Sequence, residues 1–235
     1  MIKFNFPFAL DMLIVVSASL LGAQPGFAQT GALPSRTAEA QPSDIDPKSR
    51  FRLPLPRRED LDEAGKQALD RAGRPGASLA GLQGPAGVQL YSPTTSPHLS
   101  ALNNYLRFQT GHTAAIREIA ILATAREMDS QFEWVAHEPE ALKEGVAQSV
   151  IDAIKYRRAT EGLPEEQALV IQLGRELWRD HKVKSETFAK LKALYGPKKL
   201  IDLVLLMGNY AGTAALLSAV DMQLPEGKKP LMSIP

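Results

Sequence analysis

A glutamate and a histidine stand four residues apart in the run Phe132-Glu133-Trp134-Val135-Ala136-His137. At this spacing Glu133 and His137 lie on one face of a helix, where their side chains meet. A carboxylate beside an imidazole fixes its tautomer and favours its protonated form, the usual arrangement of a general acid or base. Glu118 lies in the preceding apolar segment. Facing His137 across a helix pair, it would complete a proton-transfer site.

The same residues also have purely structural interpretations. Ser130-x-x-Glu133 matches a capping box, in which Glu133 returns to the backbone amide of Ser130 and does no chemistry. Glu118 next to Arg117 fits a solvated charged stripe. His137 fits a core histidine that bonds a backbone carbonyl. Spacing alone leaves both sets of interpretations open.

A metal site is a third interpretation, with Glu118, Glu133 and His137 as ligands. Glu-x-x-x-His supplies two ligands by itself, whereas at least three are expected at a protein metal site. We therefore expect neither a metal nor a cofactor.

The distribution of proline indicates which elements carry these residues. Nine of the 17 prolines fall between Pro34 and Pro97, whereas residues 98–224 contain only three. Because proline lacks a backbone donor and clashes inside helices, we expect the first stretch to be extended or looped and the second to be almost continuously helical. No segment alternates with period two, so the predicted fold class is all-α. We expect helices over residues 57–71, 98–109, 113–128, 131–143, 147–158, 164–180, 185–195 and 197–222.

Individual prolines and glycines refine these helices. Pro139 removes the hydrogen bond to the carbonyl of Val135, which predicts a kink or a restart just after His137. Gly196 and Pro197 suit a helix end and a first turn, so a break is expected between them. Residues 73–97 are expected to wrap over the surface without regular structure.

Composition excludes several classes of protein. Lys+Arg number 27 and Asp+Glu 26, so the formal charge is +1 and no field of one sign is present to attract nucleic acid. Cysteine is absent. This excludes disulfides, zinc–thiolate clusters, iron–sulfur ligation and a cysteine nucleophile.

The N-terminus resembles an export sequence. Residues 1–28 combine Lys3, a short apolar run and a small-x-small site that predicts cleavage after Ala28. Residues 29–56 are expected to form a flexible tether or extended arm, and residues 57–235 the helical domain. The predicted location is periplasmic or secreted. A second apolar run, residues 200–220, is interrupted by Asp202 and Asn209 and is expected to be a central core helix, leaving no stable membrane span after cleavage.

Several short motifs occur in a fixed order: Arg117-Glu118-Ile119-Ala120-Ile121-Leu122, Phe132-Glu133-Trp134-Val135-Ala136-His137, Ala141, Gly145, Val150-Ile151, residues 200–210 and Leu224-Pro225. With them the chain resembles the carboxymuconolactone decarboxylase family, which also contains the alkylhydroperoxidase D-like proteins. The resemblance extends from about residue 57 to residue 230. It implies an alkylhydroperoxidase D-like helical bundle behind an extended Pro/Gly-rich N-terminal region, trimers or hexamers, and a pocket near the subunit interface.

The peroxidatic branch of that family uses Glu, then Cys-x-x-Cys, then His. Here the spacing is kept at Glu118 and His137, but Ser130 and Glu133 stand at the two cysteine positions. Thiol peroxidase activity is therefore excluded, because hydroxyl and carboxylate groups have no comparable redox chemistry. The decarboxylase branch is similar in having Glu followed by His four residues later and no required thiol.

Two functions follow as hypotheses. The first is a cofactor-free carboxy-lyase for a small carboxylated or lactone substrate, with His137 as the proton donor and Glu118 or Glu133 orienting it. In this hypothesis Arg107 or Arg117 anchors the substrate carboxylate, and Trp134 is a pocket wall or equally a core residue. The second hypothesis is a non-catalytic binding or assembly protein on the same scaffold.

Overall fold

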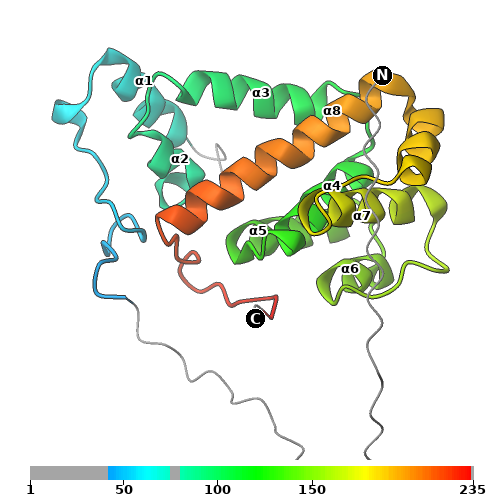
Figure 1. Ribbon diagram of the computed structural model, residues 1–235. Coiled ribbons are helices and arrows are strands. Elements are labelled where there is room, and N and C mark those ends of the chain that lie inside the picture. Colours follow the sequence, from blue (N-terminus) through cyan, green and yellow to red (C-terminus); the bar gives the residue numbers. More distant parts are fainter. Residues whose placement is uncertain (1–41, 75–79, 234–235) are drawn as a thin grey trace, which may run out of the picture. The chain divides into compact units, whose positions relative to one another are not determined.

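The computed structural model describes residues 42–74 and 80–233 (Figure 1). The regular secondary structure of these residues is entirely helical, which confirms the predicted all-α class. The α-helices are α1 (Glu63–Ala72), α2 (Pro85–Gln89), α3 (Ser96–Phe108), α4 (Ala114–Glu127), α5 (Gln131–Lys143), α6 (Gln148–Lys155), α7 (Glu165–Trp178) and α8 (Ser185–Ala219). Two short 3-10 helices, Arg58–Asp60 and Gly81–Gln83, precede α1 and α2.

Helix α4 lies at the centre of the hydrophobic core. It packs against α5, α6, α7 and α8, and its side chains are buried from Ile116 almost to its end. Small residues allow the close approach: a Cβ atom added at Gly174 of α7 would lie 2.9 Å from the Ala123 Cβ of α4. A residue on α4 is therefore surrounded by protein, and this is where Glu118 is placed.

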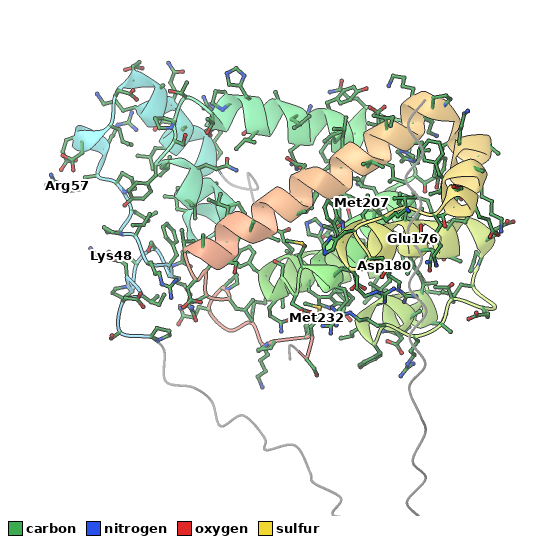
Figure 2. All side chains as sticks on the ribbon, in the orientation of Figure 1. Lys48, Arg57, Glu176, Asp180, Met207 and Met232 are labelled. Carbon is green, nitrogen blue, oxygen red and sulfur yellow. The ribbon has the colours of Figure 1, made fainter. Side chains whose placement is uncertain are left out.

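Helix α8 crosses the fold and contacts α2, α3, α4, α5 and α7 (Figure 1). It contains an 18-residue stretch that is long and apolar enough to cross a membrane, and half of that stretch is buried inside the protein. Met207, labelled in Figure 2, lies on the buried side, whereas Ile201 and Leu205 are about half exposed. The expected central core helix is thus buried along one side only, and α4 takes the central place.

The predicted break in this helix is confirmed. Gly196 has φ 70° and ψ 168° inside α8, and Pro197 begins the second half. Only glycine adopts this left-handed conformation without a steric penalty. Pro139, by contrast, lies inside α5, which continues from Gln131 to Lys143, so the expected restart after His137 does not occur.

Residues 73–97 contain more regular structure than expected. Alongside the 3-10 helix, α2 forms here and α3 begins before Pro97. Pro85 and Pro97 both occupy the first turn of a helix, where a missing N–H costs nothing. Gly87 lets α2 pack closely, since a Cβ there would lie 1.9 Å from the Leu82 carbonyl oxygen.

Residues 42–56, the last part of the expected tether, pack against the end of α8. Phe51 is fully buried with Val88 and Val220. The Arg52 amide donates to the Val220 carbonyl, and the Gln223 amide to the Arg50 carbonyl, both at 2.9 Å. This part of the arm is therefore fixed rather than flexible, because it contributes to a small apolar cluster. The predicted signal peptide (1–28) and residues 29–41 lie outside the described residues.

Candidate active site

Helices α4 and α5 bring three of the predicted residues together. The turn between the helices is short, so Glu118 in α4 faces His137 in α5. Glu118 Oε2 lies 2.7 Å from His137 Nδ1, and Glu133 Oε2 lies 3.5 Å from His137 Nε2. All three side chains are buried. The imidazole is therefore held between two carboxyl groups, one at each ring nitrogen.

The capping-box interpretation is wrong. Ser130 is the N-cap residue of α5, but its side chain makes no capping hydrogen bond. Glu133 points to His137 instead of the helix start. The solvated-stripe interpretation of Glu118 is wrong as well, because its side chain is 1% exposed.

Two arginines close the other side of Glu118. Its Oε1 atom lies 3.3 Å from Arg117 Nε and 3.5 Å from Arg107 Nη2. Arg117 Nη1 also donates to the Arg107 carbonyl at 2.7 Å, which ties α4 to α3. Both guanidinium groups lie near the ring of Phe108, at 5.0 and 5.2 Å from its centroid. Because Phe108 is 60% exposed, this is the side on which the cluster approaches solvent.

The two carboxyl groups have opposite pKa shifts. Burial by itself would raise the pKa of Glu118, but the hydrogen bond from His137 and the charges of His137 and Arg107 outweigh it, and the pKa is lowered. Burial raises the pKa of Glu133, against the smaller opposing effects of the same two charges. Glu118 is thus the ionised acceptor of a proton on Nδ1, and Glu133 is the group that tends to stay neutral at Nε2.

Trp134 is placed elsewhere. Its indole N–H donates to Glu138 Oε2 at 2.6 Å, and Lys155 Nζ lies 3.1 Å from Glu138 Oε1 and 5.8 Å from the indole ring. These contacts join α5 to α6 rather than reaching His137. They correspond to the core interpretation of Trp134.

Tyr210 of α8 is a member of the cluster that sequence reasoning did not assign to it. Its ring meets the His137 imidazole edge to face, with centroids 5.1 Å apart and planes at 86°. The side chain is 6% exposed. The sequence feature that could have indicated this position is a tyrosine inside an otherwise apolar helix, because a buried phenol hydroxyl usually has a polar neighbour.

The acidic side chains do not converge on one point suited to a metal. Glu118 and Glu133 lie at opposite nitrogens of His137, so a single ion cannot reach all three groups in these positions. Within residues 42–74 and 80–233 no group of three or more His, Asp or Glu side chains is arranged to hold a metal ion.

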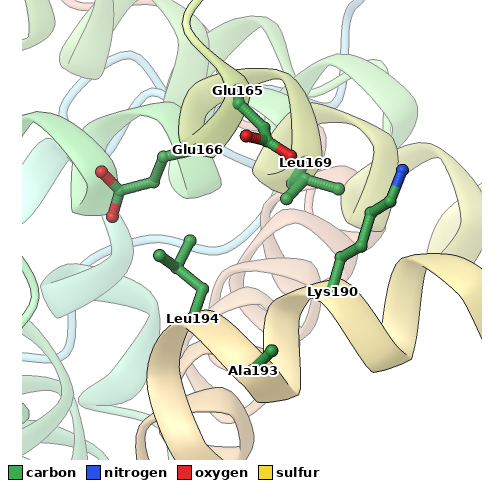
Figure 3. A pocket seen from close by; sticks show the side chains of 6 residues that line it. All are labelled: Glu165, Glu166, Leu169, Lys190, Ala193 and Leu194. Atoms are coloured by element: carbon green, nitrogen blue, oxygen red, sulfur yellow. The ribbon is translucent and has the colours of Figure 1, made fainter.

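A surface hollow of about 470 Å³ lies between α7 and α8 (Figure 3). Its lining shares no residue with the cluster around His137 and consists of Glu165, Glu166, Leu169, Lys190, Ala193 and Leu194. Lys190 is paired with Glu186 at 2.8 Å, and Tyr195 donates to Glu166 at 2.8 Å. Because its lining lies apart from Glu118, Glu133 and His137, the hollow is not the predicted site.

The described fold and cluster define an all-α protein with a buried Glu–His–Glu arrangement beside two arginines. Comparisons of the chain with protein-family models, with curated proteins and with solved structures found no match.

Proposed function

We propose that the chain is a cofactor-free lyase of the carboxymuconolactone decarboxylase type, acting on a small carboxylated or lactone substrate. The observation that carries the proposal is the imidazole of His137, held between two carboxyl groups with opposite pKa shifts. Pairs of titratable groups whose environments separate their pKa values are typical of acid–base sites.

Glu118, His137 and Glu133 have distinct roles in the proposed chemistry. Glu118 accepts a hydrogen bond from His137 Nδ1–H, which fixes the orientation of the ring. His137 Nε2 then faces the substrate. When the carbon–carbon bond breaks, CO₂ leaves and the electron pair remains on the substrate as an enolate. Protonated His137 then gives its Nε2 proton to that carbon and becomes neutral, keeping the proton on Nδ1. Glu133, kept neutral by burial, lies 3.5 Å away and returns a proton to Nε2 before solvent reprotonates it.

The charges of the cluster favour an anionic substrate. With Glu133 neutral, the single negative charge of Glu118 faces the positive charges of Arg107, Arg117 and, in the proposed mechanism, protonated His137. Positive charge is therefore left over in a largely buried place, where a substrate carboxylate would pair with it. Arg107 and Arg117 are therefore the proposed anchors.

The resemblance to the carboxymuconolactone decarboxylase family supports the rest of the proposal. It implies an alkylhydroperoxidase D-like bundle that assembles into trimers or hexamers, and the half-exposed Ile201 and Leu205 on α8 suit a subunit contact. The near-neutral charge gives no reason to expect a nucleic-acid partner. We propose a periplasmic or secreted location from the predicted signal peptide alone.

The test is CO₂ release from a panel of small carboxylated lactones by the wild type and by His137→Ala. We expect turnover to fall by about 10²–10⁴-fold, the usual contribution of a positioned acid or base. His98→Ala, which removes an exposed histidine of α3, is the matched control and is expected to keep full activity. Chelator treatment is expected to leave turnover unchanged. A folded His137→Ala protein with wild-type turnover would eliminate the mechanism.

A non-catalytic binding or assembly protein is the second candidate. The depth of the cluster favours it, because Glu118 is almost inaccessible and fully paired inside the protein. Thermal stabilisation by a panel of small acids, lost in His137→Ala, would count against a purely structural cluster.

A further inference from the structure

The C-terminal part of the described chain forms a strap, residues 229–233, that is bound at the turn joining α4 to α5. Its backbone makes no hydrogen bond to the backbone of any other described residue. The Gln131 side chain binds it instead: Oε1 accepts from the amides of Leu231 and Met232, both at 3.0 Å, and Nε2 donates to the Met232 carbonyl at 2.7 Å. A few side-chain contacts therefore hold the strap in place.

Met232 fixes the strap beside a buried arginine of α4. Its side chain is 4% exposed and packs in the main apolar cluster, and its sulfur lies 3.4 Å from Arg126 Nη1. The same Nη1 donates to the Ser233 carbonyl at 2.8 Å. The thioether thus lies at the boundary between the hydrophobic core and a cationic group.

The Arg126 guanidinium has a donor without a partner. Its Nε is buried and makes no hydrogen bond, and the whole residue is 6% exposed. Asp129 lies 3.5 Å from Nη1 and is shared with Arg157, which it pairs with at 3.2 Å. Burial, and after it the charge of Arg157, lower the pKa of Arg126, so the nearby acceptors leave its charge incompletely compensated. Because an arginine N–H cannot accept, what this place lacks is an acceptor atom.

We propose that Met232 is a site of reversible oxidation, at which hydrogen peroxide converts the thioether into a sulfoxide that the Arg126 guanidinium binds. A sulfur lone pair attacks one peroxide oxygen, the S–O bond forms as the O–O bond breaks, and the other oxygen leaves as water. Sulfur loses the two electrons that the peroxide gains. The new oxygen is a strong acceptor on a sulfur that already lies against the guanidinium. This site is independent of the proposed lyase activity.

Two features favour oxidation at this methionine. The chain contains no cysteine, so no thiol of its own competes for the oxidant. The strap has no regular secondary structure, and a segment held by few contacts opens locally at little cost. Met207 differs, because it is 0% exposed within the long helix α8 (Figure 2).

The first test uses glutamine in place of methionine sulfoxide, because both carry an oxygen on the δ atom of an unbranched side chain. Met207 is the matched control, since it belongs to the same apolar cluster and its sulfur makes no hydrogen bond among the described residues. We expect Met207→Gln to melt roughly 2–12 °C below Met207→Leu, the cost of an unpaired buried polar group in a chain of this size. Met232→Gln is expected to lose less than half as much relative to Met232→Leu. An equal loss at the two positions would overturn the proposal.

Hydrogen exchange at the amides of Leu231 and Met232 shows whether the strap stays bound, since both donate to Gln131. We expect these amides, followed at residue 232 as glutamine, to stay protected in Met232→Gln and to lose protection when Arg126→Leu is added. Arg126→Leu alone is the control and is expected to keep the protection, because an apolar residue replaces a buried charge and Asp129 keeps Arg157. Loss of protection in Met232→Gln alone would refute binding of the oxygen by Arg126.

The second test adds hydrogen peroxide to the folded chain and locates the sulfoxides by peptide mass spectrometry. We expect oxidation at Met128, which is 37% exposed, and at Met232 before Met207. Treatment with methionine sulfoxide reductases is expected to restore Met232. Met232 staying reduced for as long as Met207 would overturn the oxidation step, and a sulfoxide that the reductases leave in place would overturn its reversibility.

Discussion

Replacement of Glu118 by glutamine tests whether one buried carboxylate holds the cluster together. Its two oxygens face His137 Nδ1 at 2.7 Å, Arg117 Nε at 3.3 Å and Arg107 Nη2 at 3.5 Å. The side chain is 1% exposed, so water does not replace the lost interactions. Glutamine keeps the shape and one acceptor oxygen, but it removes the negative charge and turns an NH₂ group toward either the His137 donor or the two arginine donors.

We expect Glu118→Gln to lower the free energy of unfolding by about 3 kcal/mol. Loss of one partner from a buried ion pair costs about 3–5 kcal/mol, and the retained acceptor oxygen places this substitution at the lower end. In a chain of this size each kcal/mol changes Tm by roughly 2–4 °C, so the expected decrease is roughly 6–12 °C.

The effect also has a predicted pH dependence. Folding lowers the pKa of Glu118, so its stabilising contribution is present above the pKa it has in the unfolded chain. The contribution is lost as the pH falls through the lower pKa of the folded protein. The difference in Tm between the wild type and Glu118→Gln is therefore expected to shrink in acid.

Thermal and urea unfolding followed by circular dichroism measure this effect. The control is Glu140→Gln on α5, where the carboxylate pairs with Lys143 at 3.2 Å in a more exposed position. An exposed pair is worth about 0–1 kcal/mol, so this variant is expected to resemble the wild type. The reasoning is refuted if Glu118→Gln loses no more stability than Glu140→Gln.

Three further predictions concern packing and titration. Gly174→Ala places a Cβ 2.9 Å from the Ala123 Cβ and is expected to cost about 1–3 kcal/mol in urea unfolding; an unchanged midpoint would contradict the close contact of α4 with α7. Gly208→Ala, in open space within α8, is expected to gain about 0.5–1 kcal/mol in the same assay, and a loss would show that this face is covered. Folding raises the pKa of Glu133, so its ionisation opposes folding as the pH rises above its unfolded value. Glu133→Gln is therefore expected to gain Tm relative to the wild type between acid and neutral pH, and parallel profiles would argue against a buried neutral carboxyl.

The helices that carry the site follow from local chemistry. Residues 131–143 are helical as expected, and Gly196 interrupts α8 where glycine and proline stand together. Such boundaries depend on neighbouring residues, which the sequence displays directly. The short helix α2 was missed because it is held by tertiary packing, in which Val88 joins Phe51 and Val220 in a small apolar cluster.

The site was predictable to the extent that it is local. Glu133 and His137 share one helix, and the i, i+4 spacing brings them together. Their meeting with Glu118 depends on how α4 packs on α5, so spacing left it open. Tyr210 lies in a distant helix, and no spacing rule connects it to His137. Trp134 shows the converse limit, since its neighbours in sequence do not reveal that it faces α6.

A structural role explains some members of the cluster better than others. Glu118 pairs with two partly buried arginines and would be needed in any protein that kept them. Glu133 has no such structural role. Burial raises its pKa and so favours the neutral carboxyl group beside the His137 imidazole. An apolar residue would fill the same space without the free-energy cost of desolvating a carboxyl group. The unpaired, buried Arg107 Nε likewise adds cost without adding a contact. Sites that retain unfavourable groups of this kind are typical of function rather than of packing, and here Glu133 lies beside His137 and Arg107 beside its partner Glu118.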